Sequence, residues 1–223
     1  MDKRQGKLIV IDGIDGSGKT TQSELLKQYL ASQGPTLQVE VINFPRYEDN
    51  LYGKLIKRYL EGELGNINEV NPYLMALAYA GDRVLAKPLI ESWLNNGKLV
   101  IANRYVSSSK AHLGANLDDG KREEFIRWLD ELEYQINGMP KPNRTILLSV
   151  DPKIGQENAL KDHQVDMHEK SLEHEEKAAK IYLKISKMEE NWVVVNCMDG
   201  DKMKPILEIH QEILKILNEK LIS

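Results

Sequence analysis

The chain has 223 residues, of which 41% are apolar, and its 30 Lys and Arg against 34 Asp and Glu give a net charge of -4. This length favours a single domain over 1–223, and the charge balance gives no general reason to bind nucleic acid or an anionic membrane. The only cysteine, Cys197, excludes an intrachain disulfide and any multi-cysteine metal site, and favours a reducing compartment, for which the cytoplasm is the simplest choice. No run approaches the roughly 18 to 20 consecutive apolar residues of a membrane helix.

Five short runs rich in β-branched residues alternate with longer helical stretches. The predicted strands are 7–11, 38–44, 98–102, 145–150 and 192–196. Such alternation is typical of a parallel sheet with helices on both faces, so we expect a three-layer α/β fold.

The first predicted strand leads directly into GIDGSGKTT, residues 13–21. Residues 13–20 match G-x-x-x-x-G-K-[ST], with the required strand before and helical stretch after. Glycines let successive N–H groups turn inward, and the following helix adds its positive end, so the loop suits a phosphate chain. In this motif the lysine bridges the outer phosphates of a nucleoside triphosphate, and the next hydroxyl ligates Mg²⁺. The residues expected to hold ATP are Gly13, Asp15, Gly16, Ser17, Gly18, Lys19, Thr20 and Thr21, with Thr20 as metal ligand.

The second and third predicted strands end in FPRY and NRY, which place Arg46 and Arg104 at the ends of the strands. If the two strands lie beside the first, both arginines reach the edge that carries the phosphate loop. Two guanidinium groups there suit an acceptor that is itself a phosphate. Phe44 and Pro45, directly before Arg46, are expected beside that acceptor.

The stretch 72–94 carries apolar residues at helical spacing after Asn71 as N-cap, and Pro88 is expected to kink or interrupt it. Tyr79 and Arg83 lie four residues apart on one face. A flat ring beside a hydrogen-bonding fork suits a nucleobase, although a tyrosine at this spacing is more often part of the core.

Three later stretches are also expected to be helical. Residues 123–136 and 205–221 are amphipathic and should pack on the sheet. The segment 152–180 is dominated by charged, amide and histidine residues, so we interpret it as a mobile helical lid.

The motifs GIDGSGKTT, FPRY, YAGDR and NRYVSSSKAH, in this order and at these separations, resemble those of thymidylate kinases. These enzymes transfer the γ-phosphate of ATP to dTMP in dTTP biosynthesis, and have a phosphate-loop NTPase fold with a helical lid. The match extends over most of the chain, by motifs from residue 7 to about 150. The family is usually homodimeric through packed helices, and 72–94 could supply one face.

The resemblance also assigns roles to individual residues. Lys19 and Thr20 would handle ATP and Mg²⁺, Asp15 would face the 3′-hydroxyl of the deoxyribose, and the dTMP phosphate would lie between the two strand-end arginines. The residues implied around the base and sugar are Tyr79 stacked on thymine, Arg83 at its O4, Ser108 and Ser109 near its N3 edge, and His112 near the sugar.

Several positions depart from the family pattern. Asn103 stands where an aspartate precedes the arginine, Tyr79 replaces a phenylalanine, and His112 replaces an aromatic residue. Neither the phosphate loop nor the lid carries the family's transition-state arginine, because Arg144 is the last arginine in the chain. Lys161 and Lys170 are the replacements we expect. The lid histidines His163, His168 and His174 are interpreted as solvated residues, not as a metal site, because their spacings place no two on one helical turn.

Two alternatives follow from these departures. Tyr79 and His112 leave open a kinase for another deoxynucleoside monophosphate. Asn103 and the arginine-free lid leave open a nucleotide-binding homologue with weak catalysis.

Overall fold

The computed structural model describes residues 6–34, 37–66, 69–162 and 171–220. The elements in chain order are β1 (Lys7–Asp12), α1 (Lys19–Ser32), β2 (Val39–Asn43), α2 (Leu51–Leu60), α3 (Pro72–Asn95), β3 (Leu99–Asn103), α4 (Val106–His112), η1 (Gly114–Asn116), α5 (Asp119–Asp130), η2 (Glu131–Ile136), β4 (Arg144–Ser149), α6 (Pro152–Asp162), α7 (Leu172–Met188), β5 (Trp192–Asn196), β6 (Met198–Asp199), β7 (Lys202–Met203) and α8 (Ile206–Lys220). The five predicted strands are confirmed. The short antiparallel pair β6–β7 was not anticipated.

The main sheet is wholly parallel and has the strand order β2-β3-β1-β4-β5. Ile11, near the end of β1, pairs with Asn103 at the end of β3, which in turn pairs with Asn43 at the end of β2. The three carboxyl ends therefore lie side by side, as the sequence interpretation required. Residues that follow these strands meet at one edge.

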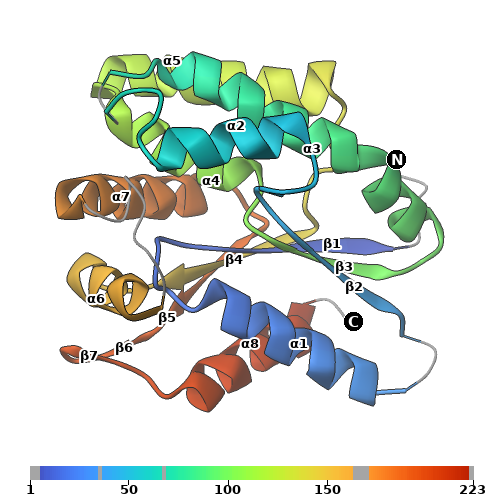
Figure 1. Cartoon of the computed structure of the whole chain (residues 1–223). Helices are drawn as coiled ribbons and strands as arrows, with labels where there is room; N and C mark the ends of the chain where they lie inside the picture. The colour runs from blue at the N-terminus through green and yellow to red at the C-terminus, as the bar shows by residue number, and fades with distance from the viewer. Residues whose placement is uncertain (1–5, 35–36, 67–68, 163–170, 221–223) are drawn as a thin grey trace.

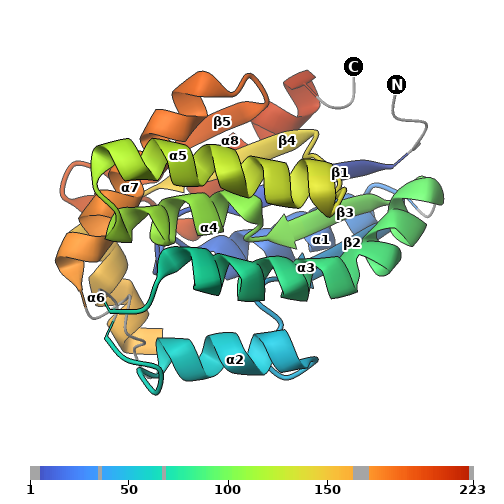
Figure 2. The same cartoon turned by 90° about the horizontal axis from the view of Figure 1, so that it is seen from above.

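Helices cover both faces of the sheet, giving the expected three layers. In Figure 1, α1 and α8 lie below the strands, whereas α3, α4 and α7 lie above them. Figure 2 shows α5 beside α4 and α2 beside α3, and Figure 1 shows α5 above α4, farther from the strands. None of the described helices is long and apolar enough to cross a membrane.

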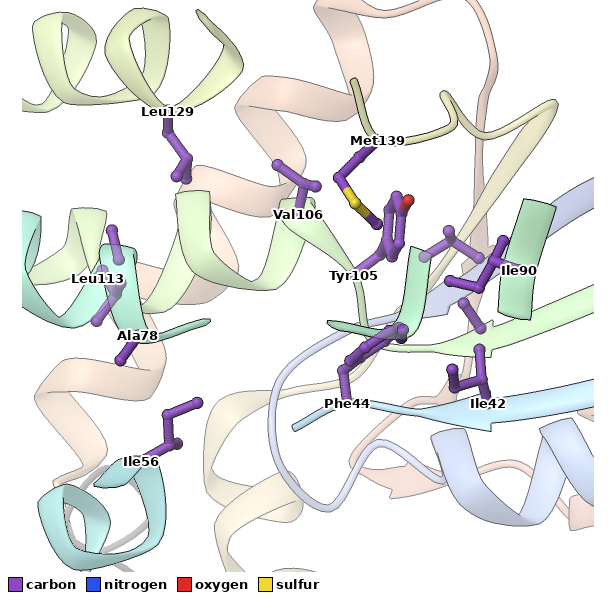
Figure 3. Packing of buried hydrophobic residues seen from close by; sticks show 14 of the residues in the cluster. Ile42, Phe44, Ile56, Ala78, Ile90, Tyr105, Val106, Leu113, Leu129 and Met139 are labelled. Atoms are coloured by element: carbon purple, nitrogen blue, oxygen red, sulfur yellow. The ribbon is translucent and has the colours of Figure 1, made fainter. Parts of the chain in front are cut away.

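Each face of the sheet has its own apolar core. β1 contributes Leu8 and Val10 to the α3 side and Ile9 and Ile11 to the α1 side, the alternation expected of a strand buried on both faces. Figure 3 shows part of the core on the α3 side of the sheet, where Tyr105 lies between Phe44 and Met139.

Two features of the helices differ from expectation. α3 runs from Pro72 to Asn95 with Pro88 inside it, so of the two expected effects of this proline the interruption does not occur. The segment expected to form a loose lid includes two helices, of which the second extends to Met188 and is anchored by buried residues such as Ala178, Ile181 and Tyr182. Of the described parts of 152–180, α6 is the one that retains the solvated character expected of the segment.

Candidate active site

The phosphate loop connects β1 to α1 and has the backbone that its glycines permit. Gly16 and Gly18 have φ angles of 67° and 86°, a region that residues with a Cβ rarely adopt. A Cβ on Gly16 would also lie 1.9 Å from the carbonyl oxygen of Gly155 in α6. Gly18, the N-cap of α1, has no side chain to cap the first-turn N–H groups. The loop therefore leaves an uncapped helix N-terminus for an anion.

Lys19 extends back across the loop. Its Nζ donates to the carbonyl of Ile14 at 2.7 Å and lies 3.8 Å from Oδ1 of Asp15. Burial, and to a lesser degree the charge of Arg104, lowers the pKa of Lys19 to about 8, although Asp15 acts in the opposite direction. An added phosphate would be a stronger counter-charge, so the amine is placed to bind one.

Arg46 follows β2 and is fixed by Asp82 of α3. Its Nε donates to Oδ1 of Asp82 at 3.0 Å, and its backbone N–H donates to Oδ2. Asp82 is almost fully buried and also accepts from Nδ2 of Asn50 at 2.7 Å. This orients the guanidinium at the sheet edge. Asp82 was not assigned a role from the sequence, although it stands in the motif YAGDR.

Arg104 follows β3 and lies next to the phosphate loop. It forms an ion pair with Asp15, and its Nη1 lies 3.2 Å from Nε2 of His112. It is the only non-glycine residue with positive φ in the described ranges, at 65°, a conformation that costs energy and is concentrated at functional sites. Burial alone would lower the pKa of Arg104, but Asp15 and other neighbours raise it. The arginine therefore remains a cation.

The residues expected around a base are brought together in part. Arg83 is buried, and its Nη2 donates to Oγ of Ser109 at 3.0 Å, while Tyr79 is half-buried one helical turn earlier. Ser108 points elsewhere, since its Oγ donates to Asp12 at 2.7 Å. Adjacent helical residues face different directions, so only one of the two serines reaches Arg83. Phe44 is buried in the core, where its ring packs against Tyr105; its expected position beside the acceptor stays a prediction.

Asp12 is a buried carboxylate that the sequence interpretation missed. Its Oδ1 accepts from Ser108 and from the Tyr182 hydroxyl at 2.6 Å, and its Oδ2 accepts from Ser107 at 2.5 Å. The N–H of Gly13 adds a further hydrogen bond at 3.0 Å. Asp12 thus connects the start of the loop to α4 and α7. A polar residue ending an otherwise apolar strand was the available signal.

A second missed carboxylate, Glu175, reaches the loop from α7. It accepts a hydrogen bond from the N–H of Asp15 at 3.2 Å. Burial first, and then the charge of Asp15, raises the pKa of Glu175 to about 8. His174 beside it is buried too, contrary to the expectation of a solvated histidine, and burial lowers its pKa to about 4. His163 and His168 lie outside the described residues.

Ligand atoms of His112, His174 and Glu175 lie within 4.8 Å of one another, a grouping that could hold a metal ion. Arg104 opposes this, because a permanent cation 3.2 Å from Nε2 of His112 repels a second cation. Nε2 must also accept from Arg104, which leaves the proton on Nδ1, the nitrogen that faces Glu175 at 3.9 Å. The cluster therefore fits a metal poorly.

Oxygen atoms of the kind that bind Mg²⁺ lie where the start of α1 meets the end of β3. Nδ2 of Asn103 donates to Oγ1 of Thr20 at 3.2 Å. Within the described residues, Oδ1 of Asn103 is buried and accepts no hydrogen bond. A hard cation with its waters would supply that missing partner. The residues present thus fit a magnesium ion beside the loop, even with an amide in place of the usual carboxylate.

A model of the thymidylate kinase family matches residues 11–213 of the chain. The chain is 30% identical over 222 residues to a probable thymidylate kinase of Pyrococcus abyssi, covering 98% of this chain and 99% of the relative. It is 32% identical over 216 residues to the thymidylate kinase of Thermosipho africanus, covering 96% and 99%. A solved thymidylate kinase structure from Candida albicans has the same fold, with a TM-score of 0.78 at 24% identity, covering 98% of this chain and 93% of that one.

Proposed function

The chain belongs to the thymidylate kinase family, and on that premise we propose that it transfers the γ-phosphoryl group of ATP to dTMP, giving dTDP and ADP. The observation that carries the proposal is the joint placement of a phosphate loop and two arginines. Lys19 follows β1, while Arg46 and Arg104 follow the adjacent strands β2 and β3. A donor phosphate and an anionic acceptor can therefore meet at one edge of the sheet.

The donor half comprises the loop and the first turn of α1. Its N–H groups and Lys19 hold the β- and γ-phosphates, with Gly13, Gly16, Ser17, Gly18 and Thr21 lining the turn. Thr20 and Asn103 hold the magnesium ion. Bound Mg²⁺ supplies charge neutralisation on the phosphate oxygens.

The acceptor half is built from β2, β3, α3 and α4. Arg46 and Arg104 hold the dTMP phosphate, with Pro45 alongside, while Asp15 and His112 face the sugar. Tyr79 stacks on thymine, and Arg83 with Ser109 reads its edge. Ser108 acts through Asp12 and not on the base.

The transfer requires no covalent intermediate. A phosphate oxygen of dTMP attacks Pγ, the bond from Pγ to the β–γ bridging oxygen breaks, and ADP departs with the electron pair. The protein contributes alignment and positive charge, which together carry most of the catalysis in this chemistry. Because the acceptor is already anionic, no general base is required.

An acceptor panel tests this proposal. Purified protein is incubated with ATP, Mg²⁺ and one of dTMP, dUMP, dCMP, dGMP or UMP, and the diphosphate product is quantified by ion-exchange chromatography. We expect dTDP to form with the highest kcat/KM. Preference for another acceptor would replace the proposal with a different deoxynucleoside monophosphate kinase.

We further propose that the chain forms a homodimer through α3. Leu74, Leu77, Leu85 and Leu89 are 46% to 64% exposed, and their spacing places them on one face of this helix. Four exposed leucines on one face are unusual for a monomer. A cytoplasmic location is proposed on the single cysteine.

A further inference from the structure

Arg83 is held by a buried carboxylate, Glu133, for which neither the motifs nor the relatives suggest a role. Nε and Nη2 of Arg83 both donate to Oε1 of Glu133, at 2.9 Å and 2.5 Å. Both side chains are almost fully excluded from solvent, at 2% and 0% exposure. Burial alone would lower the pKa of Arg83, but Glu133 raises it. The pair is thus a charged unit inside the protein.

Glu133 occupies an unusual place in its helix. Phe125 and Leu129 of α5 are fully buried, and Glu133 follows them at the same four-residue spacing, where the apolar stripe predicts another apolar residue. The helix changes there to the π-helical turn η2 (Glu131–Ile136), and such turns occur frequently at functional sites. Burial of a charge at this position requires a reason beyond packing.

The orientation of Arg83 decides which groups remain available to a ligand. Its other Nη2 hydrogen goes to Ser109 Oγ at 3.0 Å, and one Nη1 hydrogen goes to the Tyr105 carbonyl at 3.4 Å. Among the described residues, one Nη1 hydrogen is left without an acceptor. Because Arg83 can only donate, Ser109 must accept from it, and the serine hydroxyl hydrogen is then left to donate elsewhere.

From these contacts we infer that Glu133 is a positioning residue for base recognition: it orients Arg83 so that the remaining Nη1 hydrogen is offered to a carbonyl oxygen at position 4 of a pyrimidine. A cytosine amino group at that position meets this donor and is disfavoured. The inference rests on the proposed function, in which Arg83 faces the base. It assigns the origin of the selectivity to a residue that does not touch the ligand.

Glu133→Gln is the direct test. Oε2 of Glu133 accepts no hydrogen bond from the described residues, so the amide nitrogen can take that place while the amide oxygen still faces Arg83. The charge is lost and the shape is kept. By calorimetry we expect the Kd for dTMP to increase about tenfold, with the Kd values for dCMP and ATP changed less than about twofold.

A thermodynamic cycle separates positioning from general stability. In an Arg83→Met background, adding Glu133→Gln should leave dTMP affinity unchanged, because the residue to be oriented is absent. Removing both charges is also often tolerated in a core, so the double variant should fold. Glu189→Gln is the matched control. It weakens the ion pair between Glu189 and Lys110, a buried residue of α4 next to Ser109, and it should leave the affinity for dTMP unchanged.

Two results would overturn the inference. One is a Glu133→Gln variant that keeps the wild-type selectivity between dTMP and dCMP. The other is a loss of dTMP affinity on Glu133→Gln that is equally large in the wild-type and Arg83→Met backgrounds. Failure of the proposed function has a different signature. A wild-type protein that binds dTMP with the expected selectivity but releases no ADP contradicts the transfer and leaves the role of Glu133 standing. A wild-type protein that binds no dTMP contradicts both.

Discussion

Lys19 is a buried amine surrounded by charges of both signs. In the free protein its pKa is about 8, chiefly because of burial. Binding of the triphosphate favours the protonated amine, so its pKa must be higher in the complex. The affinity for ATP is consequently linked to pH. It is highest below the pKa that Lys19 has in the free protein, and it falls above that pKa because Lys19 must then take up a proton each time ATP binds.

We predict that the Kd for ATP is nearly constant from about pH 7 to 7.5 and then increases, approaching tenfold per unit above about pH 8. Titration calorimetry in two buffers of different ionisation enthalpy measures both the Kd and the proton uptake. Lys19→Arg, which stays charged, should show a flat profile. Equal affinity at about pH 7 and pH 9.5 in the wild type, without proton uptake, would contradict this view of Lys19.

At the same scale, the site residues that the sequence predicted are those with a local signal. Lys19 and Thr20 stand in a contiguous pattern, and Arg46 and Arg104 directly follow predicted strands. Asp82, Glu133 and Glu175 were missed because their roles depend on partners far away in the chain: Glu175 meets Asp15 only after α7 packs across the sheet edge. Pairing of this kind arises from the tertiary structure, and no periodic pattern in the sequence indicates it.

At the level of elements, the lid was the least predictable part. Strands were recognised because β-branched runs bounded by polar residues have few other interpretations. α7 was assigned to a loose segment because two titratable residues, His174 and Glu175, occupy buried positions of its inward face. Charge suggested solvation, whereas the structure buries both groups.

The lid also bears on catalysis, because it lacks arginine. α6 contacts the loop where Gly155 meets Gly16, and it carries Lys161 near its end. Lys170 lies outside the described residues. We predict that Lys161→Ala or Lys170→Ala lowers kcat about 10²-fold, less than an arginine finger would, with the KM for dTMP little changed.

Steady-state kinetics with both substrates varied provides the measurement. Lys177→Ala is the control, since Lys177 of α7 is exposed and pairs with Glu173; its kcat should equal that of the wild type. If neither Lys161→Ala nor Lys170→Ala affects turnover, the lid lysines do not replace the arginine.

At the level of the whole molecule, the parallel sheet and its layers followed from the sequence, but the strand order and the association of chains did not. Leu74, Leu77, Leu85 and Leu89 fit a helical pattern equally well whether the helix is in a core or an interface. Only the structure shows these four side chains exposed while Ala76, Ala86 and Ile90 of the same helix are buried.

We predict that the double substitution Leu77→Glu and Leu85→Glu converts a dimer into a monomer. The carboxylates remove the apolar surface that the interface buries, and like charges from the two copies repel each other across a two-fold axis. Sedimentation velocity measures the mass. Leu207→Glu, on an exposed leucine of α8, is the control and should leave the dimer intact. A wild-type monomer at assay concentration would contradict the proposed interface.

The central claim is that the loop around Lys19 passes a phosphate to dTMP. The most direct measurement is coupled ADP release with ATP, Mg²⁺ and dTMP, comparing the wild type with Lys19→Ala. We predict wild-type turnover that requires dTMP and falls at least about 10²-fold in the variant. ADP release that is independent of dTMP, equal turnover in Lys19→Ala, or no turnover by a wild type that binds both nucleotides would contradict the claim.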